Sequence, residues 1–109
     1  MSQHSRRFFR IVFANPPTLG DFRSHEELGR ALLDPSREEE WMGISVYGTL
    51  HQARKKANDY PTLGRLIAEL EIPEGSSVTY KRTGRASSHY TLQGPRTDML
   101  ACVVAVHRA

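Results

Sequence analysis

The fold is decided by residues 43–57, GISVYGTLHQARKKA, in which a strand, a tight turn and a helix follow one another directly. Apolar and polar residues alternate over 44–47, the period-two pattern of a strand with one buried face. Gly48 ends this strand, and Thr49 with Gln52 three residues later forms the capping box of a helix N-terminus. Such a junction can hold an anion, and it is equally an ordinary strand–helix connection that binds nothing.

Strand patterns on both sides of this unit predict a sheet. Residues 7–13 are rich in Phe, Ile and Val, and residues 65–72 form the most regular alternating segment of the chain. Shorter strands are expected at 78–82, 89–92 and 101–107, and the last of these is so apolar that both of its faces are expected to be buried. The sequence therefore predicts the α+β class: a single domain of five to six mainly antiparallel strands with two to three short helices.

Helix-start signals also occur before the organising stretch. A capping box at 24–27 predicts a helix that continues to the Asp-Pro pair ending at residue 35, and another at 36–39 predicts a short helical turn that ends at Trp41. We expect Trp41 to pack in the core or at its edge. The helix of the organising stretch is expected over 50–59, with its basic residues toward water or a partner, and one more helical turn over 96–100.

Composition is typical of one globular domain. The 109 residues are 39% hydrophobic and 25% charged, and no apolar run approaches the roughly 20 residues needed to span a bilayer. No signal-peptide pattern is expected, which favours a cytoplasmic location, and residues 1–6 are expected to be flexible. Cys102 is the only cysteine, so an internal disulfide and a multi-cysteine metal site are excluded. The net charge of +3 gives a weak preference for anionic partners.

Polar residues on two predicted strands are candidates for a binding site. Arg10 shares its predicted strand face with apolar neighbours, a costly place for a guanidinium unless something pairs with it. Ser45 and Tyr47 occupy the polar face of the organising strand. We interpret Arg10, Ser45 and Tyr47 as candidate nucleotide-binding residues.

The segment 80–90, YKRTGRASSHY, brings cations, hydroxyls, one histidine and two tyrosines together. Its cations can bind phosphate and its tyrosines can stack on a base, and His89 could move a proton near neutral pH. The candidate contacts to nucleic acid or phosphate are Lys81, Arg82, Arg85 and Tyr90. The same composition also describes a solvated hairpin.

Two carboxylates, Glu69 and Glu71, lie two residues apart on one face of the predicted strand 65–72. Paired carboxylates can serve as a general base and an electrostatic stabiliser, so Glu69 joins His89 as a candidate catalytic residue. The alternative is a sheet face open to water. The other histidines have no paired spacing with cysteines or acids, so no metal site is expected.

The order of these features resembles the small ADP-ribosyltransferase-type NAD-binding folds, in outline over residues 7–72. An early strand bears Arg10, a later strand before a helix bears Ser45 and Tyr47, and the strand pattern suggests a split antiparallel sheet. The resemblance implies that Arg10 contacts NAD and that Ser45 and Tyr47 support the nicotinamide pocket. These families also place an acid on a late strand, whereas the only acid here after residue 74 is Asp98.

Two short landmarks, Trp-x-Gly-Ile-Ser at 41–45 and His-Tyr-Thr-Leu at 89–92, are similar to those of a group of short bacterial proteins. That resemblance implies no function.

Three hypotheses follow. The first is a nucleotide- or phosphate-binding domain with NAD as cofactor, either active as an ADP-ribosyltransferase-like enzyme or catalytically degenerate. The second is a non-catalytic accessory module whose loop 81–90 binds RNA, DNA or an acidic protein surface. The third is a metal-independent ribonuclease that uses His89. The first requires Arg10, Ser45, Tyr47 and His89 to line one cleft.

Overall fold

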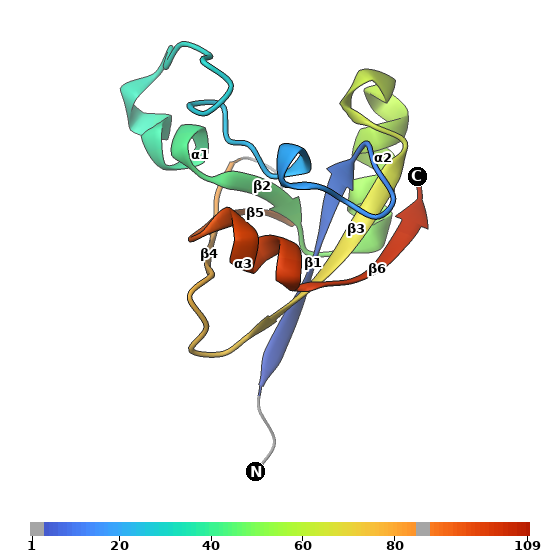
Figure 1. The fold of residues 1–109 in the computed structure, drawn as a ribbon. Helices are drawn as coiled ribbons and strands as arrows, with labels where there is room; N and C mark the ends of the chain where they lie inside the picture. Colours follow the sequence, from blue (N-terminus) through green and yellow to red (C-terminus); the bar gives the residue numbers. More distant parts are fainter. Residues whose placement is uncertain (1–3, 85–87) are drawn as a thin grey trace.

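The computed structural model describes residues 4–84 and 88–109 and confirms the α+β class. Within these residues one antiparallel sheet contains six strands: β1 (Ser5–Val12), β2 (Ile44–Tyr47), β3 (Leu66–Pro73), β4 (Thr79–Arg82), β5 (His89–Gln93) and β6 (Val103–Arg108). The helices are α1 (Glu38–Met42), α2 (Leu50–Asp59) and α3 (Arg96–Ala101), with 3-10 turns η1 (Leu19–Asp21), η2 (Pro35–Arg37) and η3 (Pro61–Leu63). Figure 1 shows their arrangement.

The sheet has the order β4-β5-β2-β1-β3-β6 and is nearly divided at its centre. Strand β1 pairs with β3 over its whole length, from Ser5↔Pro73 to Val12↔Leu66. It pairs with β2 only at Phe9↔Tyr47, and Figure 1 shows β2 turning away from β1. The two halves of the sheet therefore separate beyond this one pair, which leaves space between them.

The two faces of the sheet are covered by different elements. The alternation predicted for 65–72 is present in β3, and it places Leu70 in the core cluster that contains Phe22 and Met99 of α3, all three fully buried. On the opposite face, Ala53 of α2 is fully buried, as is Ile67 of β3. Helix α2 begins as predicted, because the hydroxyl of its N-cap residue Thr49 accepts a hydrogen bond of 3.1 Å from the backbone N–H of Gln52.

The helix predicted from the capping box at 24–27 is wrong. The capping contacts do form: Ser24 Oγ accepts from the Glu27 N–H at 3.1 Å, and Glu27 Oε1 accepts from the Ser24 N–H at 3.2 Å. Gly29 then takes a φ of +74°, the left-handed conformation that ends a helix. The chain turns once and continues as an irregular segment to Asp34, which caps η2.

Two other predictions are corrected. Strand β6 is not buried on both faces: it is an edge strand, and Val104 is 50% exposed. The flexible segment predicted for residues 1–6 is wrong at its end, because Ser5 and Arg6 belong to β1 and pair with β3. Over the described ranges, no helix combines the length and the apolar character that crossing a membrane would require.

We expect the change Gly43→Ala to destabilise the protein by about 1–3 kcal/mol, because a Cβ at this buried position would overlap its neighbours. It would lie 2.9 Å from the carbonyl oxygen of Leu92 and still nearer to the methyl group of Thr91. Urea unfolding measures the effect. Gly20→Ala is the matched control, since the nearest atom to its Cβ is at 3.4 Å. Equal stability of the two variants would contradict the prediction.

Candidate functional site

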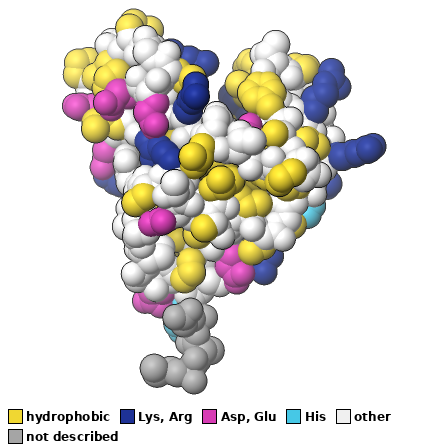
Figure 2. Space-filling view, in the orientation of Figure 1, with side chains coloured by type: hydrophobic (Ala, Val, Ile, Leu, Met, Phe, Trp, Pro, Cys, Tyr) yellow, Lys and Arg dark blue, Asp and Glu magenta, His cyan; other side chains and the backbone are white. Residues whose placement is uncertain are grey.

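A cleft of about 1310 Å³ opens where the two halves of the sheet separate. One wall is formed by residues 25–42, which include η2 and α1 and which we call the arm. The other wall is formed by α2 and η3. Both walls project from the same end of the sheet in Figure 1, and Figure 2 shows the hollow between them. The ends of β1 and β2 form the floor.

The cleft brings together the four residues on which the first hypothesis depends. Arg10 comes from β1, Ser45 and Tyr47 come from β2, and His89 comes from β5, and all four line the cleft. Strand alternation places Arg10 on the opposite sheet face from Tyr47. Arg10 reaches the same space because β1 and β2 separate beyond Phe9↔Tyr47.

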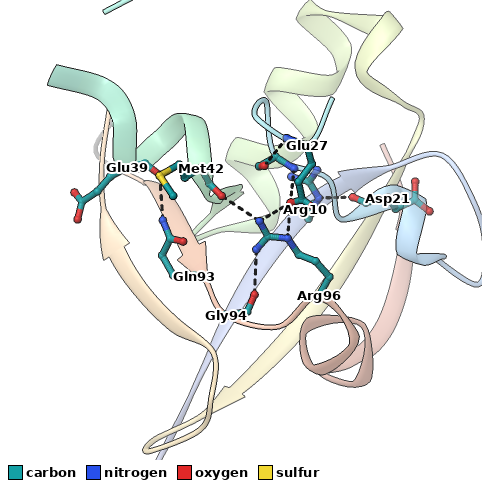
Figure 3. Close-up of polar contacts among 9 residues, drawn as sticks. Arg10, Asp21, Glu27, Glu39, Met42, Gln93, Gly94 and Arg96 are labelled. Atoms are coloured by element: carbon teal, nitrogen blue, oxygen red, sulfur yellow. Dashed lines mark hydrogen bonds and ion pairs between the residues drawn. The ribbon is translucent and has the colours of Figure 1, made fainter. Parts of the chain in front are cut away.

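The guanidinium of Arg10 is held by backbone carbonyls. Its Nε donates to the Asp21 carbonyl (Figure 3) and its Nη1 donates to the Ser45 carbonyl, each at 2.7 Å. Its Cζ lies 5.7 Å from the Phe22 ring centroid. Burial lowers the pKa of Arg10 to about 10, a change that the nearby Asp21 charge opposes, so the group is cationic at neutral pH. An arginine side chain has more N–H donors than these two bonds use.

Asp21 does not form an ion pair with Arg10 in this structure. Its carboxylate accepts hydrogen bonds from the backbone N–H groups of Phe13, at 2.8 Å, and Thr18, at 3.0 Å. It therefore closes the loop after β1 and places its own carbonyl against Arg10. Arg10 is thus oriented by neutral groups, and its positive charge is available to an anion.

Tyr47 and His89 form an aromatic pair in the cleft, edge to face with ring centroids 5.5 Å apart. Burial raises the pKa of Tyr47, which keeps its phenol protonated at neutral pH. His89 Nδ1 lies 3.1 Å from the Thr83 carbonyl, which can only accept, so Nδ1 carries the hydrogen and Nε2 is the acceptor in the neutral ring. The Thr83 hydroxyl, itself 2.7 Å from that of Thr91, helps to orient the ring.

Basic side chains outnumber acidic ones around the cleft. The basic residues that line it are Arg10, Arg23, Arg30, Arg37, Lys55 and Lys56, and the acidic ones are Asp21, Asp34, Glu40 and Asp59. Lys55 pairs with Asp59 at 3.0 Å and Arg37 with Glu40 at 2.7 Å. In the described part of the chain, the other four basic side chains have no carboxylate at ion-pair distance.

Several of these cleft residues were missed at the level of sequence. Lys55 and Lys56 looked like the solvated side of α2, and Glu40 belonged to an acidic run of the kind that usually faces water. One signal was available: Gln52, Lys56 and Asp59 recur at helical spacing and share one side of α2, which the fold turns toward the cleft.

Glu69, predicted as a catalytic residue, does not line the cleft. Its carboxylate is bound by Arg7 and by His107 Nε2, the latter at 2.7 Å. These contacts, with the His107 hydrogen bond the larger influence, hold the pKa of Glu69 below its ordinary value. Glu69 is therefore an ionised member of a cluster with Arg7 and His107 outside the cleft.

The described phosphate- and base-binding candidates of the 80–90 segment also lie outside the cleft. The cleft lining does not include Lys81, Arg82 or Tyr90. The fourth candidate, Arg85, lies outside the described residues. Lys81 pairs with Glu39 at 2.9 Å. The Tyr90 hydroxyl accepts a 2.6 Å hydrogen bond from Arg6, whose guanidinium also covers the Tyr90 ring. His89 is the residue of this segment that reaches the cleft together with Gly84.

Comparisons with known proteins assign no function to this cleft: no family model, no curated protein and no solved structure matched the chain. Within residues 4–84 and 88–109, no three His, Cys, Asp or Glu side chains are grouped so that they could hold a metal ion. The chemistry of the cleft must be inferred from its own side chains.

We expect Glu69→Gln to reduce stability at neutral pH by about 1 kcal/mol or less, because the pair with Arg7 is partly exposed. The pKa of Glu69 is lowered in the folded protein, so its contribution is present above the ordinary value of 4.5 and is lost as the pH falls through the lowered value. Urea unfolding near pH 7 and about pH 3 should show the difference from wild type shrinking in acid. Glu74→Gln, at an exposed position, is the control. A difference that persists in acid would contradict this account.

Proposed function

We propose that the cleft binds a nucleotide through its diphosphate, as a domain of the ADP-ribosyltransferase-type NAD-binding kind. The observation that carries this proposal is the convergence of Arg10, Ser45, Tyr47 and His89, from three strands, on one cleft. Each of these four residues was identified as a candidate from its type and its position on a predicted strand. They come from distant parts of the chain, and the fold brings them together.

The charges of the cleft suit a diphosphate. A guanidinium binds phosphate oxygens through paired N–H donors, and Arg10 is already oriented by two carbonyls, so less side-chain entropy is lost on binding. Lys56 projects from the opposite wall, where its Nζ lies 4.3 Å from the Tyr60 ring centroid. Cations on the floor and on the α2 wall favour a ligand whose negative charge lies between them.

Aromatic and polar groups beside Arg10 suit the rest of a nucleotide. Tyr47 and His89 offer ring surfaces for a base or a nicotinamide, and the His89 Nε2 acceptor can take a hydrogen bond from a ribose hydroxyl or an amide. Of the two residues predicted to be catalytic, only His89 lines the cleft. Glu40 is a carboxylate that lines the cleft, where its pair with Arg37 at 2.7 Å holds its pKa below the ordinary value and keeps it ionised. A transfer reaction would therefore draw on a cleft carboxylate such as Glu40 rather than on Glu69, which lies outside the cleft.

Calorimetric titration tests the binding. We expect NAD and ADP-ribose to bind, adenosine to bind more weakly, and the affinity for NAD to fall as salt is added. The double change Lys55→Gln and Lys56→Gln should weaken NAD binding by about tenfold, which corresponds to about 1.4 kcal/mol. Tyr47→Phe tests the phenol as a donor to the ligand.

Two variants control this titration. Glu69→Gln and Arg65→Gln alter charges that do not line the cleft, and they should bind NAD like the wild type. No heat at millimolar NAD would remove the proposal. If RNA then bound with a steep dependence on salt, the accessory-module hypothesis would take its place.

One observation also favours the ribonuclease hypothesis: a second histidine, His25, lines the same cleft as His89. His25 Nδ1 accepts from Arg30 at 2.8 Å, so its Nε2 carries the hydrogen and complements the His89 Nε2 acceptor. Burial, together with the charge of Arg30, lowers the pKa of His25, so most of the ring is neutral at neutral pH. Little of the protonated form is then present to act as a general acid, which counts against this hypothesis.

Incubating RNA with the protein in EDTA decides this hypothesis. Cleavage that His89→Gln and His25→Gln each abolish would support it. RNA that stays intact with the wild-type protein would exclude it.

A further inference from the structure

We propose that the arm is a lid over the cleft and that Arg96 is the positioning residue that holds its pivot, an inference that rests on the proposed function in so far as the lid closes on the same nucleotide. Arg96 does not line the cleft. It acts through the arm, from the first residue of α3.

Few side chains of the arm are even half-buried, so packing alone does little to fix its position. None of its residues is buried, and only Leu32, Glu40 and Trp41 are half-buried. The helix that its sequence predicts stops after one turn at Gly29. Segments with few buried apolar contacts have low local stability and are those that open and close in solution.

The two ends of the arm are nevertheless joined. The backbone N–H of Glu26 donates to the Trp41 carbonyl at 3.1 Å, and the indole Nε1 of Trp41 donates to the Arg30 carbonyl at 2.8 Å. These bonds connect the start and the middle of the arm to its end. The arm can therefore move as one unit rather than as a loose loop.

Arg96 fastens this joint to the rest of the protein. Its Nε donates to Glu27 Oε1 at 2.7 Å, and its Nη2 donates to the Met42 carbonyl at 3.0 Å, so one guanidinium holds both ends of the arm (Figure 3). Its Nη1 donates to the Gly94 carbonyl at 3.1 Å, which anchors the group to the connection between β5 and α3. The Arg96 side chain is 22% exposed, so these charge-assisted bonds are only partly screened.

Further along the arm, α1 is also held to the sheet. Lys81 pairs with Glu39 at 2.9 Å, and Gln93 Nε2 donates to the Glu39 carbonyl at 3.1 Å.

Apolar side chains on both walls give closure a driving force. Leu28 and Leu33 of the arm are 46% and 92% exposed, and Tyr60 and Leu63 of the opposite wall are 54% and 41% exposed. All four line the cleft. Its volume of about 1310 Å³ exceeds the 300–1,000 Å³ usual for a small-molecule site, so inward movement of the arm would both bury this surface and fit the space to a nucleotide.

Hydrogen exchange of the ligand-free protein tests the pivot. In Arg96→Ala, we expect the amides of 25–42 to exchange about tenfold faster or more, because charge-assisted bonds are lost, while β1 and β3 keep the wild-type rate. Glu27→Gln, which keeps the bonds of Arg96 to the two carbonyls, should give a smaller increase in the same segment. Arg96→Lys should restore part of the protection through Glu27, and Arg65→Ala, at an exposed arginine outside the cleft and the arm, should have no effect.

Cysteine cross-linking tests closure. The pair Leu33→Cys and Leu63→Cys, made with Cys102→Ser, places thiols on opposite walls, and a disulfide requires their Cα atoms to come within about 7 Å. We expect NAD to raise the rate of cross-linking by about tenfold, as a population shift toward the closed form of about 1.4 kcal/mol would do. Leu33→Cys paired with Val104→Cys on the edge strand β6 should show no response.

The outcomes separate the lid from the nucleotide proposal. NAD that binds by calorimetry without changing the cross-linking rate overturns the lid and leaves the nucleotide proposal standing. If NAD does not bind, the nucleotide proposal fails and hydrogen exchange alone decides the pivot. Exchange in Arg96→Ala and Glu27→Gln that is unchanged, or that rises equally throughout the sheet, overturns the pivot.

Discussion

The insertion of the Arg10 guanidinium between the two halves of the sheet is the interaction on which the rest of the structure depends. Strands β1 and β2 pair at Phe9↔Tyr47 and then separate, and Arg10 bonds the Ser45 carbonyl of β2 in place of a continued ladder. It also bonds the Asp21 carbonyl of η1, which ties the loop after β1 to the gap in the sheet. A hydrophobic side chain there would leave those carbonyls unpaired, at a cost typical of buried polar groups. The Arg10 guanidinium that fills the gap between β1 and β2 therefore also lines the cleft.

Local patterns in the sequence predicted the regular elements well. The alternation of β3 and the Thr49 cap of α2 depend only on neighbours in the chain, and both are confirmed. The capping box at Ser24 formed too, but one left-handed glycine ended the helix, because capping and propagation are separate requirements. The edge position of β6 could not be read from its apolar composition, since edge or centre is decided by the order of strands.

The candidate site was predictable in part. Arg10, Ser45 and Tyr47 were identified from strand position, but their convergence depends on the separation of β1 from β2 beyond Phe9↔Tyr47, which alternation along the chain does not reveal. Strand alternation puts Glu69 on the same face as Glu71 and does not tell whether that face borders a site. Only the tertiary structure places Arg7 and His107 against Glu69. Arg96 gave no signal at all, because two of its partners, the Glu27 carboxylate and the Met42 carbonyl, are distant in sequence and reach it only through the fold of the arm.

The position of β1 has a consequence for how the chain folds. The first strand lies in the middle of the sheet, and its longest partner is β3, so that Phe8 pairs with Leu70. Contacts this distant in sequence form only after a long loop has closed, and loop closure costs chain entropy. We therefore expect slower folding than in helical domains of similar size. During synthesis, the aromatic residues of β1 emerge before β3 and stay without this longest partner until β3 has left the ribosome.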